Sequence, residues 1–437
     1  MNRLKGKKLL VIGGSFQHVK LVEAANKMGV ITYVTDYFPY EKAPAKQIAH
    51  KYFMYNIYDI DDIVDMCKRE GIDGVLSTSL DACQKPYYEI CRRLNLPCFG
   101  KFEQFNILTD KSEFKKFCAL SGVDTIPEYD VSDFETEEVA CKKVAFPVLI
   151  KPCESRGSRG QTICNTYAET KDAIQFAKKE SSNGRIIIEK YMGQANDFSM
   201  TILVINKKAY PIRTVDRILG KYEDGLDKLA VGSASPSVFT DVYLTKAHKK
   251  VEKFIEAIGL VNAPIFMQGF VDGDTVRFYD PGLRLPGGEY ERMFESVFGR
   301  NPMEPLIEFA LTGKVEKVDF RPDDVYLNGK LLAQVLPTLK AGTIKSITGL
   351  EEIKNHKNVV SVFERFSVGD TIVETRNVNQ RFCEIDIVCD NEEQTTEVVA
   401  WVYKTLRIED ENGQNMIISS FDPNYYVNRK NILKGVI

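Results

Sequence analysis

Residues 146–165 read FPVLIKPCESRGSRGQTICN, and this stretch is the strongest guide to the fold. Residues 148–151 are apolar and β-branched before a lysine, which predicts a short buried strand. Pro152 ends that strand, because proline lacks a backbone donor. Residues 154–160 are small, acidic or basic and predict a loop, and residues 161–164 resume a strand. The stretch therefore predicts two strands joined by a glycine-containing basic loop.

Such a loop can bind an anion, because glycine lets several backbone N–H groups turn toward one ligand. The hydroxyls of Ser155 and Ser158 would add donors, and Lys151 would add a positive charge at the end of the first strand. The motif G-K-[ST] is absent, so the loop is not a P-loop. Two interpretations stay open: a phosphate-binding loop, or a mobile basic hairpin with Lys151 reaching into solvent.

Composition narrows the classes of protein. The chain has 437 residues, enough for roughly two to four domains. It is 44% hydrophobic and 27% charged with a net charge of −3, an ordinary globular balance that gives no reason to expect nucleic acid. No apolar run has the length of a membrane span or a signal peptide. The ten cysteines are scattered without a C-x-x-C motif, so we expect reduced thiols and a cytoplasmic location.

The N-terminal region predicts a parallel sheet. Residues 7–12 form an apolar strand that ends in Gly13-Gly14-Ser15, and residues 19–28 have helical periodicity. Residues 31–35 predict a second strand, followed by an acidic residue. Strands and helices continue to alternate to about residue 105, which is typical of a nucleotide-binding α/β domain. The motif G-x-G-x-x-G is missing, however, so dinucleotide binding is not favoured.

Further along the chain, a helix capped by Thr109 or Asp110 carries Lys111 in its first turn. Hairpins are predicted over residues 198–215 and 265–279, with residues 219–236 between them as a long loop. Beyond residue 302 the pattern indicates a smaller α+β domain.

The order of these polar positions resembles the ATP-grasp superfamily, and carboxylate–amine ligases in particular. Biotin carboxylase and carbamoyl-phosphate synthase are related enzymes. The resemblance covers residues 1–310, and residues 342–370 more loosely resemble the closing domain of L-amino-acid ligases. It implies an α/β fold, α+β overall. The implied parts are a Rossmann-like domain (1–105), an ATP-grasp domain (106–310) with a lid at about 148–206, and a C-terminal α+β domain (311–437).

The resemblance also implies the nucleotide-binding residues. Two lysines would bind the phosphates, the glycine loop would close over them, a glutamate-led strand would hold adenine, and an aspartate would bind the ribose hydroxyls. These residues are Lys111, Lys151, Ser155, Gly157, Ser158, Gly160, Glu189, Lys190, Tyr191, Met192 and Asp197.

The implied metal site departs from the family pattern. The family commonly has Glu on one strand and Glu-x-Asn-x-Arg on the next, whereas this chain has Gln268, then Asp280, Gly282 and Arg284. Asp280 and Gln268 are the implied ligands for Mg²⁺, or for Mn²⁺, and the number of metal ions stays open because glycine offers no ligand. Glu289 and Glu291 are interpreted as surface acids, with a compensating metal-ligand role as the alternative.

The resemblance implies an ATP-dependent ligase that activates a carboxylate as an acylphosphate and joins it to an amine. Arg284 and Lys151 are the implied catalytic residues, although Arg284 in a structural salt bridge is the alternative. Two other functions stay open: bicarbonate phosphorylation, and nucleotide binding with lost catalysis. The implied cofactors are ATP and Mg²⁺, and the implied partners are a small carboxylic acid and an amine, without nucleic acid or membrane. A homodimer is left open.

Overall fold

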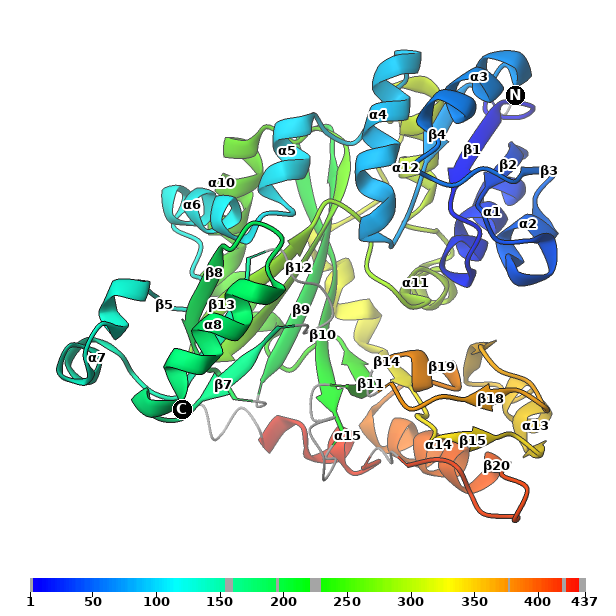
Figure 1. Ribbon diagram of the computed structural model, residues 1–437. Coiled ribbons are helices and arrows are strands. Elements are labelled where there is room, and N and C mark those ends of the chain that lie inside the picture. The colour runs from blue at the N-terminus through cyan, green and yellow to red at the C-terminus, as the bar shows by residue number, and fades with distance from the viewer. Residues whose placement is uncertain are drawn as a thin grey trace.

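The computed structural model describes residues 3–153, 160–193, 196–220, 229–375, 378–418 and 422–431. Three lobes surround a central sheet (Figure 1): the N-terminal lobe at the upper right, a small lobe at the left and the C-terminal lobe at the lower right. A parallel sheet and several antiparallel sheets confirm the expected α/β class with α+β character. In this described part of the chain, no helix has both the length and the apolar character that a membrane crossing needs.

The N-terminal lobe is a parallel sheet in the order β3-β2-β1-β4. Its strands are β1 (Lys8–Ile12), β2 (Ile31–Thr35), β3 (Lys51–Phe53) and β4 (Gly74–Leu76), and its main helices are α1 (Phe16–Lys27), α2 (Pro44–Ile48), α3 (Ile60–Glu70) and α4 (Gln84–Leu94). Parallel neighbours need crossover connections, which explains the alternation in the sequence. A Cβ atom on Gly74 would lie 2.4 Å from the carbonyl oxygen of Ala310 on α12 (Glu304–Thr312), so this later helix packs tightly against the lobe.

The small lobe has its own sheet and its own core. The antiparallel sheet has the order β5-β8-β6-β7. Its elements are β5 (Glu128–Tyr129), α7 (Glu137–Lys143), β6 (Val148–Pro152), β7 (Thr162–Cys164), α8 (Thr170–Glu180) and β8 (Ile186–Lys190). A cluster that includes Phe134, Ile150 and Ile188 fills the space between this sheet and its helices. The lobe therefore begins before residue 148 and ends before residue 206, because the next strand belongs to another sheet.

The large sheet has eight strands in the order β13-β12-β9-β10-β11-β14-β19-β17. These strands are β9 (Asp197–Ile205), β10 (Lys208–Leu219), β11 (Ala230–Ser235), β12 (Ala263–Asp272), β13 (Thr275–Gly282), β14 (Leu331–Val335), β17 (Val359–Glu364) and β19 (Cys383–Cys389). Both predicted hairpins are present as β9–β10 and β12–β13. The predicted loop over residues 219–236 is wrong at its end, because β11 is a strand. The small residues of β11 have low strand propensity, yet β11 pairs with both β10 and β14.

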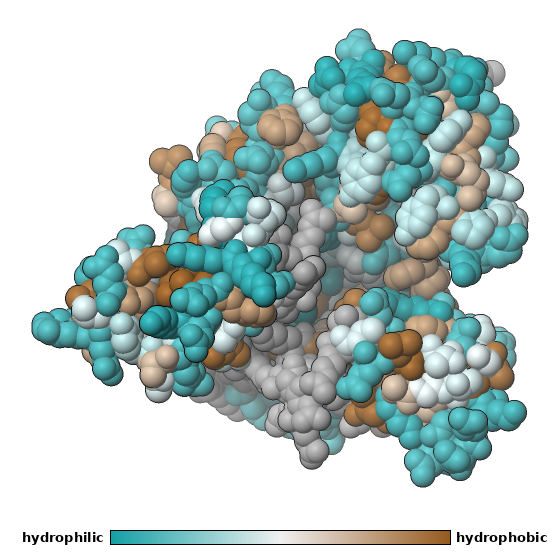
Figure 2. Space-filling model, viewed as in Figure 1, coloured by the Kyte–Doolittle hydropathy of each residue, from teal (hydrophilic) through white to brown (hydrophobic). Residues whose placement is uncertain are grey.

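Helices flank the large sheet and connect the lobes. Helix α6 packs against α10 through Phe114 and Phe254, whose ring centroids lie 5.6 Å apart. The elements of this group are α5 (Phe102–Ile107), α6 (Lys111–Ser121), α9 (Thr240–Val242), a π-helical turn (Tyr243–Ala247), α10 (His248–Ile258) and α11 (Tyr290–Phe298). Hydrophilic residues dominate the outer surface of the N-terminal lobe in the view of Figure 2.

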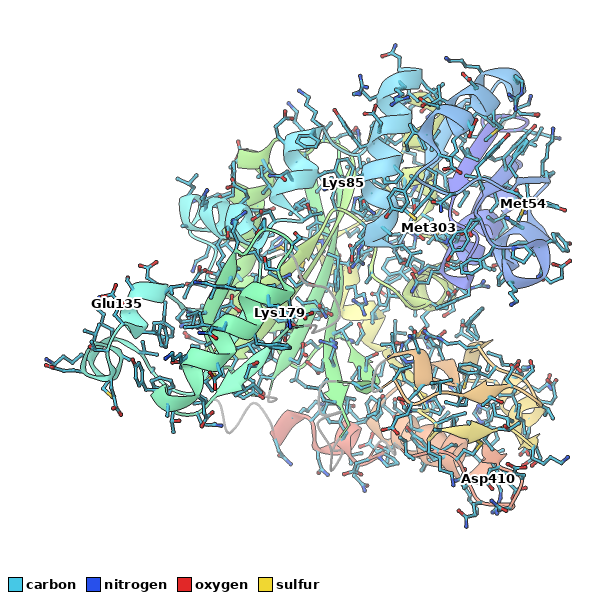
Figure 3. The ribbon with its side chains drawn as sticks, viewed as in Figure 1. Met54, Lys85, Glu135, Lys179, Met303 and Asp410 are labelled. Carbon is cyan, nitrogen blue, oxygen red and sulfur yellow. The ribbon has the colours of Figure 1, made fainter. Side chains whose placement is uncertain are left out.

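The C-terminal lobe is hydrogen-bonded to the central part of the molecule, since β11 pairs with β14. Its remaining elements are α13 (Leu350–Lys354), α14 (Glu392–Thr405), α15 (Tyr425–Asn428) and the short pairs β15 (Gly342–Thr343) with β18 (Thr371–Ile372) and β16 (Ser346–Thr348) with β20 (Arg407–Glu409). Figure 3 labels Met54 in the N-terminal lobe and Asp410 in the C-terminal lobe, both at the right of the view.

Candidate functional site

The candidate site lies on one face of the large sheet, where β13, β12 and β9 run side by side. Asp280 pairs with Gln268 across β13 and β12, and Gln268 pairs with Ser199 across β12 and β9. Paired residues of neighbouring strands point to the same face. These three side chains therefore form one row, which we call the Asp280 row.

The small lobe contacts this face through Lys151. The ammonium of Lys151 lies 6.0 Å from the centre of the Tyr279 ring, and Tyr279 is the neighbour of Asp280 on β13. Lys151 is only 4% exposed and forms an ion pair with Glu189 on β8. The interpretation of Lys151 as a solvated strand-end lysine is therefore wrong.

Glu189 is a buried carboxylate between two lysines. Besides Lys151, the ammonium of Lys115 lies 2.6 Å from Glu189, and Lys115 also contacts Glu128 at 2.7 Å. Burial alone would raise the pKa of Glu189, but Lys151 and Lys115 outweigh it and hold the pKa below its ordinary value. The side chain of Glu189 thus positions Lys151. The prediction that backbone groups of residues 189–192 contact an adenine ring stays a prediction.

Lys111 lies beside the Asp280 row. It is the first residue of α6, whose N-cap is Asp110, as predicted: the Asp110 carboxylate accepts hydrogen bonds from the Ser112 and Glu113 amides. The ammonium of Lys111 lies 3.3 Å from the carboxylate of Asp280. A cation at the start of a helix opposes the helix dipole, and this acidic neighbour offsets that cost.

The donors of the Asp280 row fit one Mg²⁺ ion that is shared with a nucleotide. Asp280 supplies a carboxylate with its side chain 40% exposed, and Gln268 supplies an amide oxygen from the paired position. Mg²⁺ takes such ligands together with phosphate oxygens and water. Among the described residues, no group of three or more His, Cys, Asp or Glu side chains is placed to hold a metal ion by itself.

Glu289 and Glu291 are not surface acids. They are 3% and 1% exposed, and their carboxylates lie 2.6 Å from Arg292 and Lys20 respectively. Burial raises the pKa of Glu289 despite the nearby Lys20 and Arg292. Both carboxylates are therefore held in buried ion pairs.

Arg284 is held by the N-terminal lobe. Its Nε and one terminal nitrogen donate to the two carboxylate oxygens of Asp81, at 2.6 Å and 3.3 Å. Its guanidinium also lies 5.4 Å from the centre of the Phe266 ring. Phe266 lies two residues before Gln268 on β12, so Arg284 projects over the face that carries the Asp280 row. Arg284 thus forms a salt bridge, as the alternative interpretation expected. The same salt bridge with Asp81 holds its guanidinium at the candidate site.

The other predicted residues are placed as follows. Asp197 is 5% exposed and lies 2.7 Å from Arg217, so its carboxylate already has a cationic partner. The backbone N–H groups of Lys190 and Tyr191 donate to the carbonyl oxygens of Pro127 and Pro147. Met192 lies two residues after the end of β8, and Gly160 lies at the start of the return to β7 with φ +70°. Ser155, Gly157 and Ser158 lie outside the described residues.

Sequence reasoning missed three partners of the site: Asp81, Lys115 and Arg217. A signal was present for Lys115, because it lies one helical turn after Lys111 and shares its face of α6. No local pattern marked Asp81, which is separated from Arg284 by 203 positions.

Two protein-family models match parts of this chain. The family described as carbamoyl-phosphate synthase L chain, ATP binding domain, matches residues 110–210, which contain Lys111, Lys151, Glu189 and Asp197. The family described as L-amino acid ligase C-terminal domain 2 matches residues 335–411. Both families are among the ATP-grasp enzymes that the sequence resembles.

Relatives of this protein span most of its length. A formate-dependent phosphoribosylglycinamide formyltransferase of Mannheimia haemolytica is 21% identical over 83% of this chain and 92% of its own. The L-amino acid ligase of Bacillus licheniformis superposes with a TM-score of 0.74 at 17% identity, over 93% of this chain and all of its own. Biotin carboxylase of Campylobacter jejuni has a TM-score of 0.75 at 16% identity, over 99% and 96%. These likenesses confirm the fold expected from the sequence.

Proposed function

We propose that this protein is an ATP-dependent carboxylate–amine ligase that releases ADP and phosphate. The observation that carries the proposal is the gathering of Lys111, Asp280 and Arg284 at one face of the large sheet. Lys151 reaches toward that face from the small lobe. Three cationic side chains gathered at one face are suited to a polyphosphate whose charge must be neutralised before transfer.

The first step transfers the γ-phosphoryl group. A carboxylate oxygen of the acid substrate attacks the γ-phosphorus, and the bond from that phosphorus to the β–γ bridging oxygen breaks. ADP leaves with the bonding electrons, and an acylphosphate remains. Lys111 and Lys151 bind phosphate oxygens in this proposal, which lowers the charge repulsion between the two anions as they approach. When bound by Asp280 and Gln268, Mg²⁺ supplies further charge neutralisation.

The second step forms the C–N bond. The amine nitrogen attacks the acyl carbon, a tetrahedral oxyanion forms, and phosphate leaves as the amine loses a proton. Arg284 is suited to this stage, because a planar guanidinium can donate two parallel hydrogen bonds to an oxyanion or a phosphate. Its pairing with Asp81 holds that plane in place over Phe266.

Phosphate release tests the proposal. Purified protein with Mg-ATP is supplied with a matrix of amino acids, small acids and amines, and phosphate is measured with and without each component. We expect release that depends on both an acid and an amine. Release with bicarbonate that needs no amine would indicate carboxyphosphate chemistry, and ATP binding without any release would indicate lost catalysis.

Lys151→Ala separates a ligand-binding role from a structural one. We expect the KM for ATP to rise about 10- to 100-fold, the range for losing a hydrogen bond to a charged group. The free energy of unfolding should also fall, because Glu189 loses one of its two cations. Lys115→Ala is the matched variant, since it removes the other cation and should lower stability with little change in KM. Equal KM values for Lys151→Ala and the unchanged protein would remove Lys151 from the site.

A further inference from the structure

A partly buried cation without an ion pair to any described residue lies on the same sheet face as the Asp280 row, with its guanidinium 5.3 Å from the centre of the Tyr290 ring. Arg213 on β10 has no ion pair with any described residue, and its one described hydrogen bond is a long one, 3.4 Å, to the hydroxyl of Ser199. Its Nε is buried and has no partner in the described part of the chain. Burial lowers the pKa of Arg213 to about 10. A buried charge normally has a partner, because its desolvation is costly.

Strand alternation gives the direction of the Arg213 side chain. Arg217 contacts Asp197, and Arg213 contacts Ser199, so the odd-numbered residues of β10 from Arg213 onward share the face of the Asp280 row. The intervening Thr214 instead bonds Thr240 on the opposite face, at 2.7 Å. Arg213 also pairs in register with Thr201, whose buried hydroxyl likewise has no partner among the described residues. Two neighbouring unsatisfied groups indicate a ligand or an ordered water.

Arg213 lines a narrow pocket of about 10 Å³ beside the loop that follows Arg284, which is room for one water molecule or one oxygen atom of a ligand. Its walls include Val215, Ser233, Gly288, Glu289 and Leu332. Gly288 has φ +89°, and a Cβ atom there would lie 3.0 Å from the amide nitrogen of Gln334. Only glycine therefore fits at position 288 in the pocket wall. Gln334 itself donates to Asp386 at 2.9 Å and closes the pocket toward the C-terminal lobe.

We propose that Arg213 binds a substrate carboxylate that is not the one activated by ATP. This inference rests on the proposed ligase function and names a substrate class for it: one of the two substrates carries a free carboxylate in the product. Strand spacing supports the distinction, because Arg213 and Asp280 lie on β10 and β13 with two strands between them, so their backbones are roughly 14 Å apart. One carboxylate cannot contact both positions.

A carboxylate fits the pocket better than a phosphate. The pocket offers one guanidinium, which matches the planar carboxylate in a bidentate way. Its other walls are largely apolar or small, and the acidic residue Glu289 also lines it. A dianionic phosphate would need further cations to offset burial next to that acid.

Kinetic assays of Arg213 variants, with charged substrates and their uncharged amides, test the inference. The variants are Arg213→Met and Arg213→Lys, with Arg277→Met as the matched control, because Arg277 is on β13 at the edge of the same sheet and is paired with Asp272 at 3.1 Å outside the pocket. Each is assayed with amino acids against their amides as the amine, and with dicarboxylic acids against their monoamides as the acid. These two arms show which substrate carries the carboxylate.

In one arm, we expect the unchanged protein to prefer the carboxylate by about 10- to 100-fold in kcat/KM. Arg213→Met should lose that preference, Arg213→Lys should keep part of it, and Arg277→Met should keep all of it. A preference that survives in Arg213→Met, or no preference in the unchanged protein, would overturn the inference.

A binding measurement separates this inference from the ligase proposal. Thermal unfolding is followed with a non-hydrolysable ATP analogue and either glycine, L-alanine, L-glutamate or succinate, each compared with its amide. We expect at least one carboxylate to raise the Tm of the unchanged protein and not that of Arg213→Met, even if no phosphate is released. If none does, the inference on Arg213 fails, whereas phosphate release decides the ligase proposal independently.

Discussion

Asp280→Asn is expected to reduce ligase turnover by about 10²–10³-fold, the loss typical of removing one electrostatic partner of a transition state. Asp280 provides the fixed negative charge of its row, since Gln268 is neutral and position 282 is glycine. Asparagine keeps the shape and removes the charge, so Mg²⁺ loses its one carboxylate ligand in the row. Steady-state kinetics over a range of Mg²⁺ concentrations measure the effect.

The matched control for this prediction is Asp274→Asn in the same hairpin. Asp274 lies at the turn, with its side chain 74% exposed beside Lys246, and should leave turnover unchanged. Gln268→Glu should be tolerated and should lower the Mg²⁺ concentration needed for activity, because it adds a second carboxylate. Anomalous scattering from Mn²⁺ in crystals with an ATP analogue would place the ion. Two full peaks that both avoid Asp280 would contradict the assignment.

Glu189→Gln is expected to have the largest effect on stability, a loss of about 3–5 kcal/mol, because it leaves the buried Lys151 without its carboxylate and Lys115 with Glu128 alone. Glu189 is 1% exposed and contacts both Lys115 and Lys151. Glutamine has nearly the same volume, so packing changes little. Urea unfolding of both proteins at neutral pH measures the difference. The control is Glu138→Gln on α7, whose carboxylate is 79% exposed and pairs with Lys142.

The same pair of proteins gives a pH test. The lysines lower the folded-state pKa of Glu189 below its ordinary value of 4.5. The carboxylate therefore contributes stability that is fully present above that value and is lost as the pH falls through the lower folded-state pKa. The stability difference between the unchanged protein and Glu189→Gln should shrink in that acidic range. A difference that stays constant down to pH 3 would show that the charge of Glu189 is not what stabilises the lobe.

Sequence patterns predicted the elements of the site well where the information is local. The Asp110 cap, the strand before Lys151 and the two hairpins depend on neighbouring residues, so periodicity and turn chemistry revealed them. β11 was predicted as loop, because its residues Ala-Val-Gly-Ser-Ala-Ser become a strand only through pairing on both sides. Here tertiary contacts override low intrinsic propensity.

Long-range ion pairs were beyond local patterns. Lys151 was singled out as a phosphate-binding residue, but nothing in the sequence indicated that the Glu189 carboxylate is its partner. Glu291 pairs with Lys20 across 271 positions, so nothing near it in the sequence indicated burial. Only the fold brings these charges together, and their partners determine whether each is a ligand-binding group or a structural one.

The difference in how the lobes are attached to the large sheet determines which of them can move. The small lobe has a complete sheet and core of its own and shares no strand with the large sheet, so it can tilt as one body without breaking any strand pairing. The C-terminal lobe would have to separate β11 from β14 to do the same. We therefore expect the small lobe alone to open and close over substrates. The opposite wall, with Gln334 and the pocket of Arg213, should stay in place as the fixed surface on which the substrates are aligned.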